Sequence, residues 1–431
     1  VVKDLPSVQF EEDSPDMRYW VPHILPYIKS WDNGKTQQQV LGSVDELFSW
    51  YNDLIDDMEP SDPSKLKVIV DSIVIGSAND REKVERIFKW TQANIKYVAV
   101  ENGLGGFIPR TGAAVCSKRY GDCKDMASII TEMTRLAGVE TNLTWIGSRD
   151  IPYKYTELAT PSVDNHMIAA YKDGDDWLFL DATGSYEYFG QPTAFIQGKE
   201  ALIRISDSEY EIVEVPIAKA KENERTIKSE TYLDDGVLKS KSSAVLTGYY
   251  ASAMKGLLER LDADEKEEYL NLYFKQGNNK CKLENIEYTL SEEDRLIEFT
   301  FEMSLADYVL NVDDELIVNL NLDKPYSGYA VDEDRSQSRS FRFESLVAYE
   351  TSFSIPEGYQ LEFLPESSSG VSGGISYEIS YQLEEDKVLY QASFELSTLM
   401  LKPEGFKEWN ALIKGLKKEL KNAIVLKKKK I

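Results

Sequence analysis

Up to about residue 140, apolar residues recur every three or four positions, which is the spacing of one face of a helix. Predicted helices begin at Ser43, which opens a capping box, at Asp62-Pro63, and near Asn79. Residues 1–35 show no clean period and contain several prolines, so we expect an irregular arm there.

A further amphipathic helix is predicted after Asp122. Asp122 is a suitable N-cap, Asp125 follows three residues later as in a capping box, and Gly138 provides a stop. The apolar face of this helix consists of Met126, Ile129, Ile130, Met133, Leu136 and Ala137. Cys123 therefore falls in the first helical turn.

Two buried strands are predicted next, over 165–171 and 176–181, because both runs are apolar on both faces. Asp173-Gly174 between them is a strong signal for a tight hairpin. If these two residues form the loop, His166 lies directly opposite Asp181, with Cβ atoms roughly 5 Å apart. If the loop is instead the four residues 173–176, Asp181 faces Ile168.

Beyond residue 210 the pattern is mostly that of strands. A hairpin is predicted at Asp235-Gly236, a helical stretch interrupts at 249–274, and alternating strands at 375–383 and 388–396 flank a turn. The Ser/Gly-rich stretch 365–374 predicts a mobile loop. A final amphipathic helix contains Phe406, Trp409, Leu412, Ile413, Leu416 and Leu420.

These patterns predict an α+β protein in three parts. Residues 1–35 form an N-terminal arm, 36–210 form a core of helices followed by an antiparallel sheet, and 211–431 form a β-sandwich-like domain with a C-terminal helix. Of the 431 residues, 42% are hydrophobic and 11% aromatic, which is enough for ordinary cores. No run of about 18 apolar residues occurs, so we predict no transmembrane segment.

The formal net charge of −25 argues against nucleic acid as a partner, because phosphate binding requires a basic surface. The C-terminal lysines, which end at Lys427–Lys430, allow two interpretations. One is contact with acidic lipid, and the other is a solvated helix face with a frayed tail. Three cysteines make no disulfide framework.

Cys123, His166 and Asp181 are the candidate catalytic residues, because a thiol, an imidazole and a carboxylate are the parts of an acyl-transfer site. At the start of a helix, free amides and the helix dipole favour a thiolate, so we expect the pKa of Cys123 to lie below about 8.5.

Each candidate also has an alternative interpretation. A single buried cysteine or histidine is often only structural. A zinc site of Cys116, Cys123, His166 and Asp181 is disfavoured, because its two cysteines are too far apart in sequence for a typical zinc motif. A Cys116–Cys123 disulfide would block the nucleophile. We predict no cofactor and no metal.

Two other features could contribute to a substrate site. Trp145 and Trp177 could line a substrate groove or simply pack in the core. The glycine-rich loop 102–106 lacks the Gly-Lys-Ser/Thr ending of a phosphate-binding loop, which argues against nucleotide binding.

The most specific string is Tyr120-Gly121-Asp122-Cys123-Lys124-Asp125, preceded by Arg119. Together with 97–106, Pro109, Asn165-His166 and 180–183, it resembles the transglutaminase-like core of the papain-like cysteine superfamily over roughly residues 40 to 200. The resemblance implies Cys123 as nucleophile, His166 as general base and then acid, and Asp181 as the orienting carboxylate.

The same resemblance extends to the flanking regions. The region after residue 205 is diffusely similar to the β-rich C-terminal part of the same architecture. Residues 1–35 resemble the tail of a β-rich domain, and because the chain starts without Met we expect a fragment of a longer protein. The family contains amide-cleaving, transamidating and inactive members, so membership alone does not fix the activity.

Two functions are therefore expected as alternatives. One is cysteine-dependent hydrolysis or acyl transfer on peptide or protein amides through a thioester on Cys123. The other is a non-catalytic binding or scaffold module. The resemblance implies a bacterial cell-envelope location, whereas the residues alone equally allow the cytoplasm.

Overall fold

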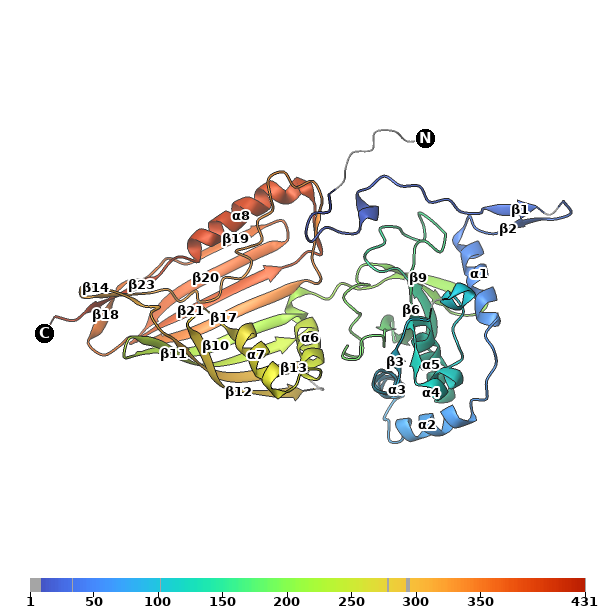
Figure 1. The fold of residues 1–431 in the computed structure, drawn as a ribbon, viewed down its shortest axis with the longest axis horizontal. Helices are drawn as coiled ribbons and strands as arrows, with labels where there is room; N and C mark the ends of the chain where they lie inside the picture. Colours follow the sequence, from blue (N-terminus) through green and yellow to red (C-terminus); the bar gives the residue numbers. More distant parts are fainter. Residues whose placement is uncertain (1–8, 33, 101, 277–278, 292–294, 431) are drawn as a thin grey trace. The chain divides into compact units, whose positions relative to one another are not determined.

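The computed structural model describes residues 9–430 except 33, 101, 277–278 and 292–294. These residues form two compact units (Figure 1). One comprises Pro15–Ala218, and the other comprises the described residues up to Ser14 together with those from Lys219 onward. Each unit is described by itself.

The first unit packs helices against a five-stranded antiparallel sheet with the strand order β7-β6-β5-β8-β9. Its helices are α1 (Val44–Asp56), α2 (Ser64–Val74), α3 (Asp80–Asn94), α4 (Gly112–Lys118) and α5 (Cys123–Leu136). Its strands are β5 (Asn142–Ile146), β6 (His166–Asp173), β7 (Asp176–Leu180), β8 (Glu200–Arg204) and β9 (Tyr210–Glu214).

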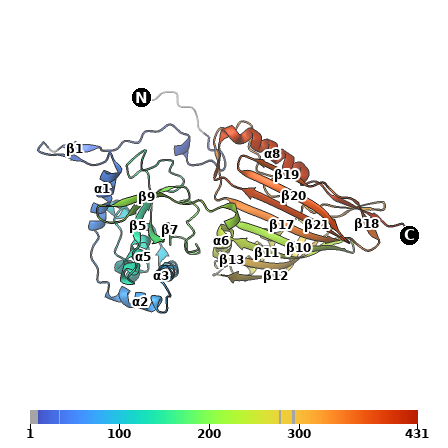
Figure 2. The same ribbon diagram turned by 180° about the vertical axis from the view of Figure 1, so that it is seen from behind.

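Three shorter features complete this unit. Strands β1 (Ser30–Asp32) and β2 (Gln37–Gln39) form a hairpin that projects beyond α1 (Figures 1 and 2). Strand β3 (Lys96–Tyr97) pairs in parallel with β4 (Tyr120–Gly121), immediately before α5. The 3-10 helices η1 (Met17–Tyr19) and η2 (Gly103–Gly106) lie in the connections.

Helix α5 is the central helix of the first unit, because its apolar residues face both the other helices and the sheet. Ile129, Ile130 and Met133 are completely buried, in one cluster with Val70 of α2 and Ile87 of α3. Ala169 of β6 and Leu180 of β7 belong to the same cluster. Burying this face holds the start of α5 and the sheet in a fixed relation.

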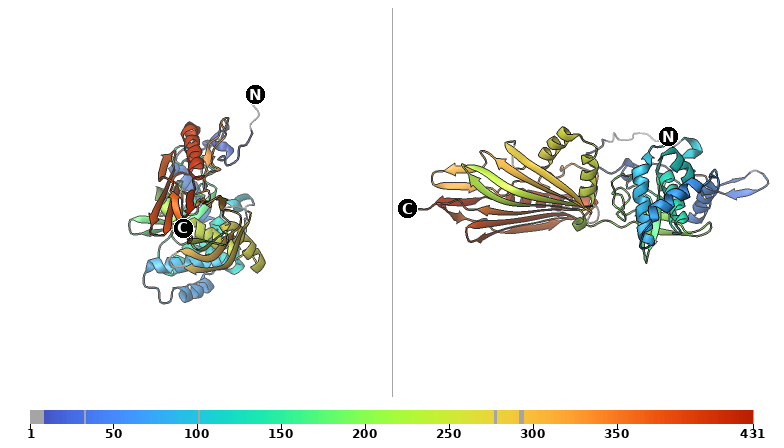
Figure 3. Two further views of the ribbon diagram at one scale, coloured as in Figure 1. Left: turned by 90° about the vertical axis from the view of Figure 1, so that its left-hand side faces the viewer. Right: turned by 90° about the horizontal axis from the view of Figure 1, so that it is seen from below.

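The second unit is built on an eight-stranded sheet with the order β12-β13-β11-β10-β17-β21-β20-β19. Neighbouring strands are antiparallel except for β10 and β17. These strands are β10 (Glu224–Asp234), β11 (Val237–Thr247), β12 (Cys281–Ser291), β13 (Leu296–Leu305), β17 (Ser345–Ser354), β19 (Ser368–Ser372), β20 (Ile375–Glu384) and β21 (Lys387–Leu396). The sheet is twisted and curved (Figure 3).

Smaller sheets and three helices accompany it. A four-stranded sheet has the order β14 (Leu310–Val312), β15 (Glu315–Val318), β23 (Ile424–Lys428), β18 (Tyr359–Phe363), and β16 (Arg339–Ser340) pairs with β22 (Met400–Leu401). The helices are α6 (Gly248–Leu258), α7 (Ala263–Phe274) and α8 (Phe406–Glu419), with 3-10 turns η3 (Ala220–Glu222) and η4 (Pro403–Gly405). The expected β-rich region with a helix near its end is confirmed.

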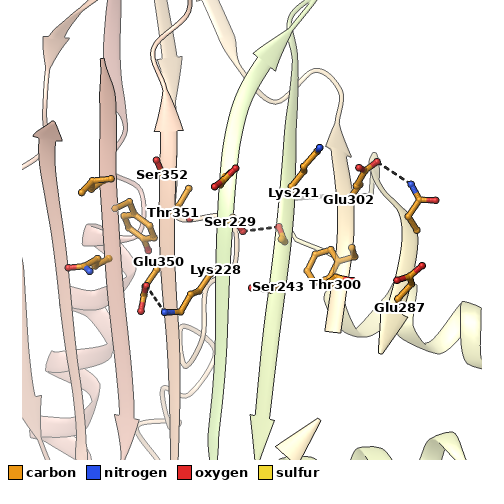
Figure 4. A pocket seen from close by; sticks show the side chains of 17 residues that line it. Lys228, Ser229, Lys241, Ser243, Glu287, Thr300, Glu302, Glu350, Thr351 and Ser352 are labelled. Atoms are coloured by element: carbon orange, nitrogen blue, oxygen red, sulfur yellow. Dashed lines mark hydrogen bonds and ion pairs between the residues drawn. The ribbon is translucent and has the colours of Figure 1, made fainter. Parts of the chain in front are cut away.

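The two faces of the large sheet differ in polarity. One face is apolar and buried, and the other carries exposed charged residues such as Lys241 and Glu302. A hollow of about 670 Å³ lies on this polar face (Figure 4), where Lys228 pairs with Glu350 at 3.0 Å. An antiparallel sheet commonly has one solvated face, so this polarity needs no bound partner.

The prediction of a mobile loop over 365–374 is wrong for half of its length. Residues 368–372 form β19, which pairs with β20. A Cβ on Gly370 would lie 2.6 Å from Leu412 of α8 and 2.8 Å from Tyr377. The glycine therefore reflects close packing under a helix rather than mobility.

The interpretation of the C-terminal lysines as a solvated helix face with a frayed tail is also wrong in part. Lys414, Lys417 and Lys418 do lie on α8, but the chain then returns as β23, whose Ile424 and Leu426 are completely buried. Lys427 lies 3.6 Å from Glu315 on the neighbouring β15. Buried Ile424 and Leu426 alternate with the partly exposed Val425 and Lys427, which is the pattern of a strand with one buried face. In the described part of the chain, no helix combines the length and apolar character needed to span a bilayer.

Candidate active site

Cys123 is the first residue of α5, as the capping pattern predicts. The Asp125 amide donates to the Asp122 side chain at 3.4 Å, and the Asp122 amide donates to the Asp125 carboxylate at 3.3 Å, which completes the capping box. Asp125 also accepts a charge-assisted hydrogen bond of 2.6 Å from Arg110. A Cβ on Gly121 would lie 2.5 Å from the Cβ of Asp125, so only glycine fits here. The position of Cys123 is thus fixed by several independent contacts.

A buried ion pair flanks Cys123. The Lys124 ammonium pairs with the Asp122 carboxylate, and both side chains are almost completely buried. The Val100 amide donates to the same carboxylate at 3.4 Å. These contacts tie the residues before and after Cys123 to the loop that follows β3. Cys123 itself is half-buried and free of disulfides.

His166 and Asp181 are in direct contact. His166 Nε2 lies 2.8 Å from Asp181 Oδ2, and both side chains are buried. Because Nε2 faces the carboxylate, Nδ1 is the ring nitrogen left for Cys123, whose sulfur is near enough to help raise the pKa of His166. The structure thus brings together all three residues that the sequence singles out.

Two threonines also hold the Asp181 carboxylate. Thr193 donates its hydroxyl at 2.8 Å, and Thr183 donates its hydroxyl at 2.6 Å and its amide at 3.1 Å. Thr183 lies two residues after Asp181, and side-chain-to-backbone turns of this kind have a recognisable local pattern. Thr193 is distant in sequence and carries no local signal.

The electrostatics of the pair follow from burial and charge. Burial alone would raise the pKa of Asp181, but the nearby His166 and the hydroxyls of Thr183 and Thr193 outweigh it and lower this pKa to about 2. Burial alone would lower the pKa of His166, but Asp181 and Cys123 outweigh it and raise this pKa to about 10. The pair therefore favours an imidazolium beside a carboxylate.

The hairpin has the register expected for the longer loop over 173–176, and not the one expected for a loop of Asp173-Gly174. Asp173 pairs with Asp176, so Gly174 and Asp175 form the turn and the directly opposed arrangement of His166 and Asp181 is wrong. Gly174 has a φ of +65°, which suits the first central position of such a turn. Asp181 follows the last residue of β7, and from there it reaches diagonally to His166.

A polar cluster anchors the residues that precede His166. The Asp164 carboxylate accepts hydrogen bonds from Tyr51 at 2.6 Å and Tyr155 at 2.8 Å. Burial raises the pKa of Asp164 to about 7, although the two tyrosine hydrogen bonds oppose the shift. Asn165 accepts a hydrogen bond from the Ser148 amide at 2.9 Å. The sequence analysis does not identify this cluster.

Three other candidate residues, Cys116, Trp145 and Trp177, have surroundings that fit a structural role. Cys116 is buried in the core of the first unit, where burial raises its pKa. Trp145 is buried and stacks on Tyr51 with ring centroids 4.6 Å apart, so its interpretation as a groove wall is wrong. Trp177 donates to Glu211 at 3.0 Å and carries the Lys172 ammonium over its ring.

No metal site accompanies these residues. In the described ranges, no three His, Cys, Asp or Glu side chains are grouped so that they could hold a metal ion. Of the glycine-rich stretch 102–106, Gly103–Gly106 forms η2, while Glu101 of the quoted 97–106 string lies outside the described residues.

A helix that starts at a thiol, followed by an antiparallel sheet that supplies an imidazole and a carboxylate, defines a cysteine-protease-like fold. Residues 67–182 match the transglutaminase-like superfamily, and residues 314–426 match a domain of unknown function with solved structures, DUF3858. The chain thus combines a region similar to the transglutaminase-like superfamily with a C-terminal region similar to DUF3858.

One solved structure has a similar overall fold. A proposed protease from Parabacteroides distasonis ATCC 8503 superposes with a TM-score of 0.53 at 10% sequence identity, over 94% of this chain and 64% of that one. This chain therefore spans less than two thirds of that protein, and the similarity concerns the fold alone. Legionella pneumophila LapG matches with a TM-score of 0.21 at 15% identity, over 34% of this chain and 73% of LapG in its EGTA-treated form. A search of curated proteins found no match.

Proposed function

We propose that the protein cleaves amide bonds of peptides or proteins through a thioester on Cys123, and passes the acyl group to water or to an amine. The observation that carries the proposal is the contact between His166 and Asp181 at 2.8 Å, with the Cys123 sulfur near enough to the same imidazole to help raise its pKa. A scaffold that only binds has no need of this arrangement. The match to the transglutaminase-like superfamily supports the same chemistry.

In the first half of the proposed reaction, the Cys123 sulfur attacks the amide carbonyl carbon and a C–S bond forms. The carbonyl oxygen becomes an oxyanion at the start of α5, where the Cys123 amide lacks an intrahelical acceptor. His166 transfers its proton to the amide nitrogen, the C–N bond breaks, and a free amine leaves with a thioester remaining.

In the second half, water or an amine attacks the thioester and gives its proton to His166. The C–S bond breaks, a carboxylic acid or a new amide leaves, and the Cys123 sulfur is regenerated. Asp181 stays ionised throughout and keeps Nδ1 of the imidazole directed at the sulfur, as its lowered pKa favours.

The test is cleavage of a proteome-derived peptide mixture by the whole chain, with new termini identified by mass spectrometry. Cleavage that Cys123→Ser and His166→Gln both abolish supports the proposal. Hydroxamates formed on adding hydroxylamine report acyl transfer to an amine. A Cys281→Ser variant is the matched control, because Cys281 belongs to β12 in the other unit. Cleavage that survives Cys123→Ser contradicts the mechanism, and no cleavage by the wild type favours the scaffold.

We also propose, from the family resemblance, that the protein is located in the bacterial cell envelope. Fractionation of the native host with an antibody against this chain tests it, and a purely cytoplasmic signal would contradict it.

A further inference from the structure

Exposed apolar side chains are concentrated in the segment between β3 and α4. Tyr97, Val98, Val100, Leu104 and Phe107 are all exposed, from 39% for Val98 to 66% for Leu104. Single exposed apolar residues are ordinary on a protein surface, whereas a group of them indicates a binding surface. The position of this segment relative to Cys123 therefore matters.

The segment 97–110 is fastened on both sides of Cys123. At its start β3 pairs with β4, and the Val98 amide donates to the Gly121 carbonyl at 2.9 Å. At its end the Arg110 amide donates to Asp125 at 2.9 Å. Because Gly121 and Asp125 are two residues before and after Cys123, both ends of this segment lie beside the residues that flank the nucleophile.

On the imidazole side, Phe195 provides a second exposed apolar group. Its ring meets the His166 ring edge-on, with centroids 5.1 Å apart, and 42% of the residue is exposed. Its carbonyl accepts a hydrogen bond of 2.7 Å from the Arg149 amide. Thr193, two residues earlier, holds Asp181. Phe195 is therefore fixed beside the imidazole although its ring is open to solvent.

The proposed reaction assigns these two apolar surfaces to the two sides of the cleaved amide. His166 protonates the leaving amine, so the residue that follows the cleaved bond must lie on the imidazole side, next to Phe195. The acyl part stays bonded to the Cys123 sulfur, so the residues that precede the bond lie toward the segment 97–110.

We infer that the site takes an extended peptide with bulky apolar side chains on both sides of the cleaved bond, an inference that rests on the proposed function. Phe195 contacts the side chain after the bond, and Val98 and Leu104 contact side chains before it. Removing such apolar surface from water favours binding, and a pocket of this kind discriminates by about tenfold or more per side chain.

The first test is binding, which needs no turnover. Fluorescein-labelled peptides that differ only in having Leu-Phe, Ser-Ser or Asp-Asp around a central amide are titrated into the Cys123→Ala chain by fluorescence anisotropy. The Leu-Phe peptide should bind at least about tenfold more tightly than the others. Equal binding, or binding of none, overturns the inference, and the exposed surface then covers another part of the chain or a second copy.

The second test assigns the two sides. Phe195→Ala should lower kcat/KM about tenfold more for peptides with Leu or Phe after the bond than for those with Gly there. Leu104→Ala should do the same for the residues before the bond. Phe363→Ala, an exposed phenylalanine of the second unit, is the matched control and should change neither.

Failure of the inference and failure of the proposed function give different results. Cleavage that depends on Cys123 but shows no preference for apolar neighbours overturns the inference and leaves the function standing. No cleavage of any peptide, together with equal alkylation of Cys123 and Cys281 by iodoacetamide, overturns both.

Discussion

Replacing Asp181 with asparagine tests the imidazole–carboxylate pair with the smallest structural change. Asparagine keeps the size of the side chain and one oxygen that can accept from either Thr183 or Thr193, which donate to different carboxylate oxygens, but it removes the negative charge beside His166. The imidazolium is then buried without a counter-charge, which is strongly unfavourable.

The expected magnitude follows from the shifted pKa values. The pKa of His166 at about 10, against an ordinary 6.5, corresponds to roughly 5 kcal/mol in favour of the imidazolium, shared between Asp181 and Cys123. The pKa of Asp181, lowered from 3.8 to about 2, corresponds to about 2–3 kcal/mol. Both values place the interaction between the two groups at a few kcal/mol, so Asp181→Asn should lower the pKa of His166 by about 2 units or more.

Histidine NMR is well suited to this measurement, because the chain has only two histidines. With ¹⁵N-labelled imidazoles, the His166 signal should titrate at about 2 units lower pH in Asp181→Asn, and the His23 signal should respond identically in both proteins. Asp176→Asn, an exposed carboxylate on the same strand β7, is the control.

Stability should change in a defined pH window. The raised pKa of His166 gives stability that is complete below about pH 6.5 and lost as pH rises through about 10. The lowered pKa of Asp181 gives stability present above about pH 3.8 and lost as pH falls through about 2. The loss of stability in Asp181→Asn, measured by urea unfolding, should therefore be largest between about pH 4 and 6.5. An unchanged His166 titration would refute this account of the pair.

Three further predictions concern the surroundings of the site and the fold. The pKa of Asp164 is raised to about 7, so its contribution to stability is full below about pH 3.8 and lost as pH rises through 7. Between pH 4 and pH 8, the free energy of unfolding of Asp164→Asn in urea should therefore rise by up to about 4 kcal/mol relative to that of the wild type. A difference that stays constant with pH would contradict this. Gly121→Ala should cost about 1–3 kcal/mol and lower Tm, because its Cβ would lie 2.5 Å from that of Asp125, whereas an unchanged Tm would show that the capping box can shift freely. Gly415→Ala, where a Cβ meets nothing within 4 Å inside α8, should instead stabilise by about 0.5–1 kcal/mol, and a loss of stability would argue against that helix.

The parts of the site that depend on local sequence could be predicted. Asp122 and Asp125 are three residues apart, so their reciprocal hydrogen bonds, and with them the position of Cys123, follow from the residues themselves. The apolar face of α5 likewise follows from its spacing and is buried as expected.

Register and long-range partners could not be predicted in the same way. The sequence of residues 173–176 permits a turn at Asp173-Gly174 or at Gly174-Asp175. Only the packing of the whole sheet selects Gly174 and Asp175. Thr193 reaches Asp181 from a separate loop, which no local pattern shows. Gly370 resembles a loop glycine in sequence, although it is needed because α8 packs over β19.

The most direct measurement of the central claim is the rate at which iodoacetamide alkylates each cysteine at pH 6, mapped by mass spectrometry. We predict that Cys123 reacts far faster than Cys116 and Cys281, and that His166→Ala abolishes the difference. Equal, slow alkylation of all three cysteines, or fast alkylation of Cys123 that persists without His166, would contradict the claim that this imidazole activates this sulfur.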